Sequence, residues 1–405
     1  MDRHPRRRRR IGLAALLAAL LAAVVVGAAA FTRAVPSAEP TQTLSGTLSP
    51  AAAVQLPWPS RGQAAVTVEG VGTIESSPGA RPLPTASMAK VMTALVVLNA
   101  KPLAAGQQGP TITVDSAAIQ DYDNRLANGE STVPIVEGEQ LSEYQALQAL
   151  LLPSGNNVAA LLARWIAGSE PAFVQLMNAR ARRLGMGQTN FADASGASTQ
   201  TVSTPADLVR LGTSGMANPV LAGIVAQPQA SLPVAGDVNN LDTELGRAGI
   251  VGIKTGSLPA PAGSDFLFAG HEPAPWGGSV TVVGVVQGLP SLDAAFAATE
   301  ALITAAPGAV ARRRVATRGQ LVGRYRTAWG SSAPIAVARD LVPAAWRDAP
   351  FGMRLVARPL HPPVQAGTVV GRLEAIDGPQ VSTTPVRLSQ TLEGPGFLWR
   401  LARKP

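Results

Sequence analysis

A serine and a lysine stand three residues apart in the run Ser87-Met88-Ala89-Lys90. In a helix, positions three apart lie on one face, so the lysine amine can reach the serine hydroxyl. A serine hydroxyl is a poor nucleophile until a base removes its proton, and a lysine can be that base when burial or nearby positive charge lowers its pKa. A serine at a helix start also offers its own backbone N–H, near the positive end of the helix dipole, to an anionic intermediate. Ser87 and Lys90 therefore fit nucleophilic catalysis.

Lysine is rare in this chain, which makes each lysine more informative. The sequence has 30 arginines and only four lysines, Lys90, Lys101, Lys254 and Lys404. Arginine cannot usefully lose its proton in a protein, whereas lysine can. The apolar run Met88–Leu98 around Lys90 disfavours the alternative that this lysine is a solvated helix charge. Lys90 and Lys254 are therefore candidates for proton transfer.

Histidine and cysteine can supply little of the chemistry. The chain has no cysteine, which excludes disulfides, thiolate metal sites and a cysteine nucleophile. Its three histidines, His4, His271 and His361, lie far apart in the sequence and cannot build a His-rich metal site. Only His271, which follows a predicted strand, is a plausible base. With at most one candidate among the histidines, we expect hydrolytic chemistry here to use a base other than histidine.

Two further short motifs follow Ser87-x-x-Lys90 in the chain, Ser154-Gly155-Asn156 and Lys254-Thr255-Gly256. In this order and spacing the three resemble the motifs of serine D-alanyl-D-alanine carboxypeptidases, the low-molecular-mass penicillin-binding proteins. The surrounding residues are similar to that family as well, and the resemblance covers about residues 60–305. The segments that carry it are 84–94, 150–157, 173–178, 184–186 and 203–208.

The resemblance implies four catalytic residues. Ser87 would attack the carbonyl between the last two D-alanines of a peptidoglycan stem peptide, with Lys90 as its base. The resulting acyl-enzyme would be hydrolysed by water. Ser154 and Lys254 would relay a proton to the departing amine. The resemblance also implies inhibition by β-lactams, and it implies neither a metal nor an organic cofactor.

Substrate binding is implied for four more positions. Asn156 would hydrogen-bond the substrate amide, and Thr255 would hold the terminal carboxylate beside the charge of Lys254. Gly256 and Ser257 complete this set, and the backbone N–H of Ser257 would form the oxyanion hole together with that of Ser87. The residues after Gly256 and the helix after Gly288, which lacks a basic residue that some members use, depart from the family pattern.

Other functions remain open on the sequence alone. A class A β-lactamase would share the three motifs, but it needs a glutamate between the second and third motifs to activate the deacylating water, and residues 186–202 contain none. A catalytically weak protein of the same fold that binds the cell wall is a second alternative. Transpeptidation, or endopeptidase cleavage of cross-links, could use the same serine.

The pattern of apolar and turn residues predicts the elements that position these motifs. A buried helix is expected at Met88–Leu98, with Ser87 at its start. The residues Pro153 to Asn156 break a helical pattern, so Ser154 and Asn156 are expected on a tight loop between helices. Lys254-Thr255-Gly256 is expected at the end of a strand. The remaining predicted elements are strands at 64–68, 72–75, 250–254, 266–270 and 279–286, and helices at 141–152, 157–166, from 171 to 184, from Ser203 and Pro205 onwards, and at 292–305.

Strands at both ends of this segment predict one sheet assembled from both ends. The resemblance implies an α/β (α+β) class, with a penicillin-binding and β-lactamase-like domain whose central antiparallel sheet is flanked by helices. A small C-terminal β domain is expected after it. Its strands are predicted at 320–325, 335–338, 353–357, 368–373 and 386–388.

The N-terminus predicts export. Arg6–Arg10 precede an apolar run, Ile11 to Phe31, whose 21 residues would span roughly 30 Å as a helix. Positive charge before the run predicts a single-pass anchor with the catalytic domain outside the cytoplasm. The alternative is a cleaved signal peptide, for which Gly27-Ala28-Ala29-Ala30 supplies small residues near a possible cleavage point.

Charge is distributed unevenly along the expected domains. These are a basic leader and anchor at 1–33, a linker at 34–60, the catalytic domain at 61–306 and the β-rich domain at 307–405. Residues 306–405 hold 15 basic and five acidic residues, whereas residues 11–305 carry a net charge of −7. Without a recognition helix, a zinc-ligand set or an aromatic-interleaved basic motif, nucleic acid is not an expected partner. Anionic wall polymers or lipid headgroups fit better, and residues 397–404 either touch a membrane surface or form a final strand with a frayed tail.

Overall fold

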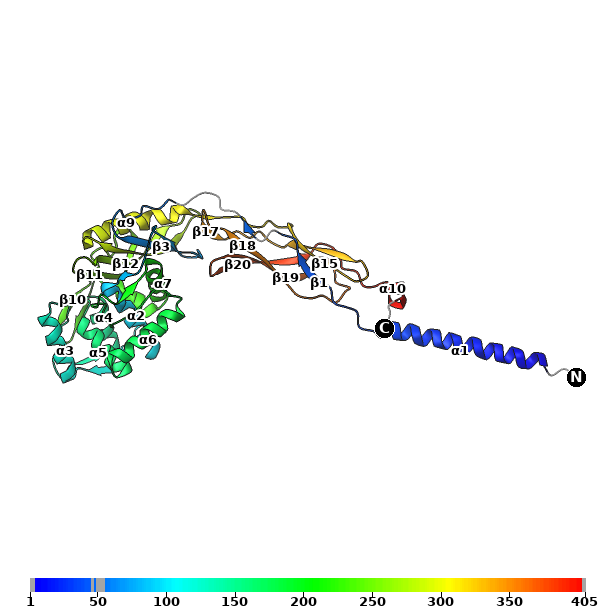
Figure 1. Ribbon diagram of the computed structural model, residues 1–405, viewed down its shortest axis with the longest axis horizontal. Helices are drawn as coiled ribbons and strands as arrows, with labels where there is room; N and C mark the ends of the chain where they lie inside the picture. The colour runs from blue at the N-terminus through cyan, green and yellow to red at the C-terminus, as the bar shows by residue number, and fades with distance from the viewer. Residues whose placement is uncertain (1–3, 45–46, 49–54, 403–405) are drawn as a thin grey trace. The chain divides into compact units, whose positions relative to one another are not determined.

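The computed structural model describes residues 4–44, 47–48 and 55–402 (Figure 1). The chain divides into two compact units. The α/β unit consists of Ala51–Arg312 with Ala344–Ala349, and the β unit consists of Met1–Pro50, Arg313–Pro343 and Pro350–Pro405.

A five-stranded sheet forms the centre of the α/β unit, with the order β11-β12-β13-β3-β4 and antiparallel neighbours throughout. Strands from both ends of the unit meet where β13 pairs with β3 and Val283 faces Thr67. The predicted single antiparallel sheet is therefore confirmed. The strand bounds are β3 (Gln63–Val68), β4 (Glu75–Ser76), β11 (Ile250–Leu258), β12 (Gly263–Pro273) and β13 (Ser279–Leu289).

Helices cover both faces of this sheet. Side chains alternate along a strand, and Leu267 on β12 points toward α7, where it lies beside Gly212. Its neighbour Phe266 points the other way and meets Phe296 of α9 edge-on, with ring centroids 5.2 Å apart. The predicted sheet flanked by helices is confirmed. The helices are α2 (Ala89–Ala100), α3 (Ser116–Ala127), α4 (Glu143–Leu151), α5 (Asn156–Ala167), α6 (Glu170–Arg183), α7 (Pro205–Met216), α8 (Pro219–Val225) and α9 (Leu292–Ala309).

Several element ends differ from the sequence prediction because short strands compete with the helices. The helix expected from residue 141 begins at Glu143, since Gln140–Ser142 pairs as β7 with β6 (Thr111–Thr113) and the Ser142 side chain caps the helix. The N-terminal cap of α7 is Thr204 and not the expected Ser203. Ser203 belongs instead to β8 (Val202–Ser203), which pairs with β5 (Leu83–Pro84). The hairpin of β9 (Gln229–Leu232) and β10 (Gly236–Asn239) was not expected.

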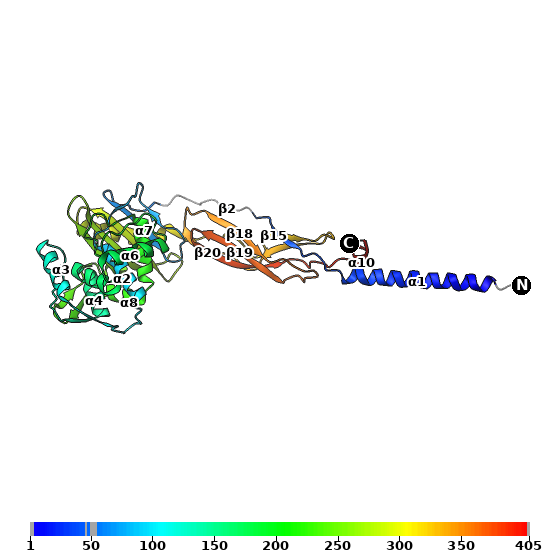
Figure 2. The ribbon, with the colours of Figure 1, turned by 60° about the horizontal axis from the view of Figure 1, so that its bottom comes forward.

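The β unit contains a seven-stranded antiparallel sheet, in which β18, β19 and β20 lie side by side (Figures 1 and 2). The predicted strands of the C-terminal segment are found there. The sheet has the order β1-β15-β16-β20-β19-β18-β2 and consists of β1 (Glu39–Gln42), β2 (Thr47–Leu48), β15 (Leu321–Arg326), β16 (Ser332–Val337), β18 (Phe351–Ala357), β19 (Val369–Asp377) and β20 (Gln380–Leu388).

The structure divides the chain differently from two expectations, the linker at 34–60 and the domain boundary after residue 306. Residues 39–42 and 47–48 are edge strands of the β unit, and residues 45–46 and 49–54 of the linker lie outside the described residues. Edge strands are held by backbone pairing and need no apolar alternation, so a polar stretch gave no strand signal. After Arg312 the chain returns to the α/β unit as β17 (Ala344–Trp346), which pairs with β14 (Val310–Arg312).

One helix near the N-terminus is long and apolar enough to cross a membrane, among the residues that the structure describes. It lies within α1 (His4–Thr32), and its span Gly12–Thr32 has 21 residues and a mean hydropathy of 2.6. At the other end of the chain, Phe397–Ala402 forms the short helix α10 instead of a final strand. Residues 403–404 of the predicted apolar and basic end lie outside the described part of the chain.

Glu143 gives the α/β unit a testable pH dependence. Its side chain is fully buried at the start of α4, where neither carboxylate oxygen has a hydrogen-bond partner among the described residues. Burial raises the pKa of Glu143 from 4.5 to about 7, and Lys101 only partly opposes this effect. The folded chain therefore holds a proton that the unfolded chain releases, and the stability that this proton confers is lost as the pH rises from 4.5 to about 7.

We therefore expect Glu143→Gln to remove this loss of stability at higher pH. Above pH 7 the variant should exceed the parent in free energy of unfolding by on the order of 2 kcal/mol, and below about pH 4.5 the two should converge. Denaturant unfolding of the detergent-solubilised chain across this pH range measures the difference. A difference that does not change with pH would contradict the expectation.

Candidate active site

Ser87 lies in η1 (Ala86–Met88), a short 3-10 turn that leads directly into α2. The residue before it, Ala86, has a φ of +45°, which is uncommon for a residue with a side chain and is typical of strained functional sites. Gly196, with a φ of +82°, fits against this turn because a Cβ added there would collide with the Ala86 carbonyl oxygen. The half-buried Ser87 is thus fixed at the helix start, where the sequence predicts it.

Lys90 meets Ser87 as the spacing predicts. Its Nζ donates to Ser87 Oγ at 2.8 Å and to the Ser195 carbonyl oxygen at 3.0 Å, and its side chain is fully buried. Burial, and then the nearby charge of Lys254, lower the pKa of Lys90 well below its ordinary value. The neutral amine therefore forms more readily than in a solvated lysine, and it can accept the Ser87 proton across the same short contact.

The second motif lies on the predicted loop between α4 and α5. Ser154 has a φ of +67°, and its buried Oγ has no hydrogen-bond partner in the described residues. Asn156 is the first residue of α5 and is also buried. Asn157, which the sequence did not single out, holds the loop by a pair of hydrogen bonds to the backbone of Val133, with distances of 2.9 and 3.0 Å. Ser154 and Asn156 are thus held in a strained and well-anchored loop.

The third motif lies within β11, which continues to Leu258 instead of ending at the motif. Lys254 is buried, and burial lowers its pKa to about 7 against the opposing charge of Asp242. Its Nζ donates to the Thr255 carbonyl oxygen at 3.1 Å. Ser257 exchanges a hydrogen bond of 2.6 Å with Ser264 on β12.

Gly256 explains how the third motif approaches the first. A Cβ added at Gly256 would lie 3.1 Å from the Ser87 backbone nitrogen and 2.9 Å from the Ala86 Cβ. Any side chain here would push β11 away from the serine, so the glycine permits the contact. The charge of Lys254 reaches Lys90 and lowers its pKa, which places the two amines in one site.

Three contributors to the site had no usable sequence signal. Ser195 acts through its backbone carbonyl, for which residue type carries no information. Asp193 and Glu130 act through their charges, which raise the pKa of Lys90. Each lies in a loop and is brought to the site only by the fold. No spacing rule from the motifs could have identified them.

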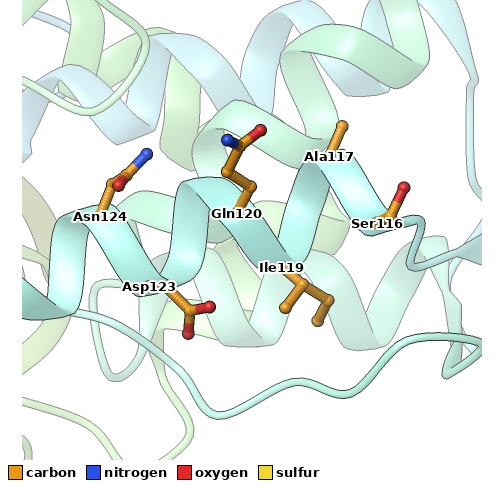
Figure 3. Close-up of a pocket in the computed structure, with 6 residues that line it drawn as sticks. All are labelled: Ser116, Ala117, Ile119, Gln120, Asp123 and Asn124. Carbon is orange, nitrogen blue, oxygen red and sulfur yellow. The ribbon is translucent and has the colours of Figure 1, made fainter.

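A shallow hollow of about 600 Å³ lies elsewhere, along α3 (Figure 3). Six residues line it, all on successive turns of that one helix, and none is an expected site residue. They are Ser116, Ala117, Ile119, Gln120, Asp123 and Asn124.

Comparisons with known proteins agree with this geometry. A family model described as D-alanyl-D-alanine carboxypeptidase matches residues 73–265. The D-alanyl-D-alanine carboxypeptidase of Streptomyces sp. (strain K15) is 30% identical over 227 residues, which are 52% of this chain and 74% of that protein. The crystal structure of the Streptomyces K15 DD-transpeptidase has a TM-score of 0.55 and 25% identity, over 62% of this chain and 98% of that one.

A D-alanyl-D-alanine endopeptidase of Pseudomonas aeruginosa is 33% identical over 150 residues, which are 37% of this chain and 45% of that protein. The match to this relative thus spans less than half of its length. The Streptomyces relative, in contrast, is covered over most of its length, and the resemblance expected from the three motifs is confirmed. The chain belongs to the D-alanyl-D-alanine carboxypeptidase family of serine peptidases.

Proposed function

We propose that this protein removes the terminal D-alanine from peptidoglycan stem pentapeptides through an acyl-Ser87 intermediate, and that β-lactams inhibit it by acylating the same serine. One observation carries the proposal. The Lys90 amine is fully buried, has a lowered pKa and lies 2.8 Å from the Ser87 hydroxyl. This arrangement is what an activated serine nucleophile requires.

In the proposed acylation, Lys90 acts as the base of Ser87. Neutral Lys90 takes the proton of Ser87 Oγ as that oxygen attacks the carbonyl carbon of the scissile D-alanyl-D-alanine bond. The backbone N–H groups of Ser87 and Ser257 stabilise the oxyanion. The proton that Lys90 took from Ser87 passes through Ser154 and Lys254 to the departing amine, so Lys90 is neutral again, free D-alanine leaves and the acyl-enzyme remains. Water then hydrolyses the ester and restores Ser87.

The remaining motif residues are assigned to substrate binding. Lys254 and Thr255 bind the terminal carboxylate, whose negative charge favours the protonated form of a lysine with a pKa of about 7. Gly256 lets this strand lie against the serine turn. Asn156 binds an amide of the peptide chain.

The apolar helix near the N-terminus supports a location in the membrane. The span Gly12–Thr32 anchors the chain in the cytoplasmic membrane, and the arginines that precede it stay on the cytoplasmic side. The α/β unit then lies outside the cytoplasm, where peptidoglycan is found. Cleavage after the span would release the same unit as an exported protein, so the catalytic chemistry does not depend on retention of the helix.

The test uses the full chain in detergent. Intact mass after incubation with benzylpenicillin is expected to show one covalent adduct, and peptide mapping should place it on the peptide that contains Ser87. A stem pentapeptide should release D-alanine, whereas cleavage only of cross-linked dimers would instead indicate an endopeptidase. A folded chain that gains no adduct, releases no D-alanine and does not hydrolyse the drug would favour the wall-binding alternative.

A further inference from the structure

Asn156 is hydrogen-bonded to an acidic residue that none of the three motifs contains. Its Nδ2 donates to Glu130 Oε2 at 2.7 Å. Glu130 stands in the segment that follows α3. The backbone N–H of Asn156 also donates to the Ser131 carbonyl oxygen at 2.8 Å, so this segment holds the start of α5 at two adjacent points.

The chemistry of the contact decides how the Asn156 amide is turned. An ionised carboxylate only accepts hydrogen bonds, so Asn156 must present its nitrogen to Glu130 and turn its oxygen away. Oδ1 is buried and has no hydrogen-bond partner in the part of the chain that the structure describes. A buried acceptor without a donor is costly. The orientation is therefore suited to a donor that arrives with a ligand.

Arg125 holds the Glu130 carboxylate in place. Its Nη1 donates at 2.9 Å to Glu130 Oε2, the same oxygen that Asn156 contacts, and its Nε donates to Asp121 at 2.8 Å. The Arg125 side chain is 15% exposed and that of Glu130 is 25% exposed, so this ion pair is partly shielded from solvent. Paired in this way, Glu130 has little freedom to move away from Asn156.

Arg125 also supports the residues that hold Lys90. Its Nη2 lies 3.7 Å from Glu170 Oε2, and Glu170 Oε1 accepts from the backbone N–H of Ala194 at 2.9 Å. The carbonyl of the next residue, Ser195, accepts from Lys90 Nζ. Arg125 thus connects the residues that hold Asn156 with those that hold Lys90.

We propose that Glu130, held by Arg125, is a positioning residue that keeps the Asn156 amide oxygen turned toward the substrate. The inference rests on the function proposed above, in which Asn156 binds a peptide amide. Oδ1 then accepts from a peptide N–H, and the Nδ2 hydrogen that Glu130 does not use donates to a peptide carbonyl. Without Glu130 the amide can turn by half a rotation, which sets a donor against the peptide N–H.

The test compares Glu130→Ala with Glu130→Gln in the full chain. Glutamine can place its amide oxygen where Oε2 lies, so it retains the acceptor for Asn156 and loses only the charge. Acylation by benzylpenicillin is expected to be roughly 10- to 100-fold slower in the alanine variant and within about 3-fold of the parent in the glutamine variant. For D-alanine release, the alanine variant should lose kcat more than it raises KM.

A pH profile separates positioning from charge. The charge of Glu130 raises the pKa of Lys90, so both variants should move the acidic limb of the profile to lower pH by the same amount. Only the alanine variant should also lose rate at the plateau. Glu137→Ala, an exposed glutamate of the same segment, is the matched control and should behave as the parent.

The outcomes are distinct. Equal plateau rates for the parent and Glu130→Ala, or equal losses in both Glu130 variants, would overturn the inference while the proposed function stands. A folded parent that is not acylated would overturn the proposed function and the inference with it.

Discussion

Replacing Ser87 with alanine is expected to abolish the covalent adduct with benzylpenicillin and to slow D-alanine release by on the order of 10⁴-fold or more. The substitution removes the oxygen that lies 2.8 Å from the Lys90 amine and leaves the rest of the site in place. Substrate binding and the oxyanion donors can remain, but no acyl-enzyme can form. Intact mass spectrometry measures the adduct, and a coupled D-alanine assay measures turnover.

The controls must show that the loss of activity comes from the missing Ser87 hydroxyl and not from a change in the fold. Ser279→Ala changes an exposed serine at the first residue of β13 and should leave both activities unchanged. Ser87→Ala should also melt close to the parent, because a half-buried hydroxyl is replaced by a smaller group. An adduct of undiminished yield in Ser87→Ala would show that another residue is acylated.

The motif-bearing elements of the α/β unit were predictable because their patterns are local. Ser87 and Lys90 are joined by helical spacing, and the apolar run after them marked a helix that is in fact buried along nearly all of its length. The strand that carries Lys254 begins with β-branched residues and is bounded by glycine and proline. In each case the neighbours in the sequence are also the neighbours that determine the structure.

Elements that depend on distant partners could not be predicted in the same way. The strand Glu39–Gln42 exists because it pairs with Leu321–Arg326, about 280 residues later in the chain. Its own residues are polar and include a proline, so no alternation marks it. The return of Ala344–Trp346 to the α/β unit is of the same kind, since its pairing with Val310–Arg312 is visible only in the fold.

The same limit applies to the candidate site. Motif spacing predicts which residues would touch a substrate, but not the groups that orient them. In the sequence, Glu130 looks like any acidic residue on the surface. Its contact with Asn156 depends on how the loop after α3 folds back onto α5. Ser195 contributes a carbonyl, which every residue carries. Supporting groups of this kind become visible only when the chain is folded.

Replacing Lys90 with methionine or arginine is expected to slow acylation by benzylpenicillin by roughly 10³-fold or more. Methionine preserves an unbranched side chain but cannot take a proton, and arginine preserves the positive charge but cannot lose one. If Lys90 acted only through its charge, the arginine variant would retain most of the rate. Stopped-flow measurement of adduct formation gives the rate constants of the parent and of both variants.

Lys101 provides the matched control, because it is exposed and lies over the Trp165 ring at 5.9 Å, whereas Lys90 is fully buried. Lys101→Met and Lys101→Arg should acylate within about 3-fold of the parent. Burial of the Lys90 amine disfavours its charged form, so replacing it with an apolar thioether should keep the melting temperature within about 5 °C of the parent. A well-folded Lys90→Met chain that acylates at the parental rate would show that Ser87 obtains its reactivity from another group, and loss of rate without loss of stability would identify the Lys90 amine as the base.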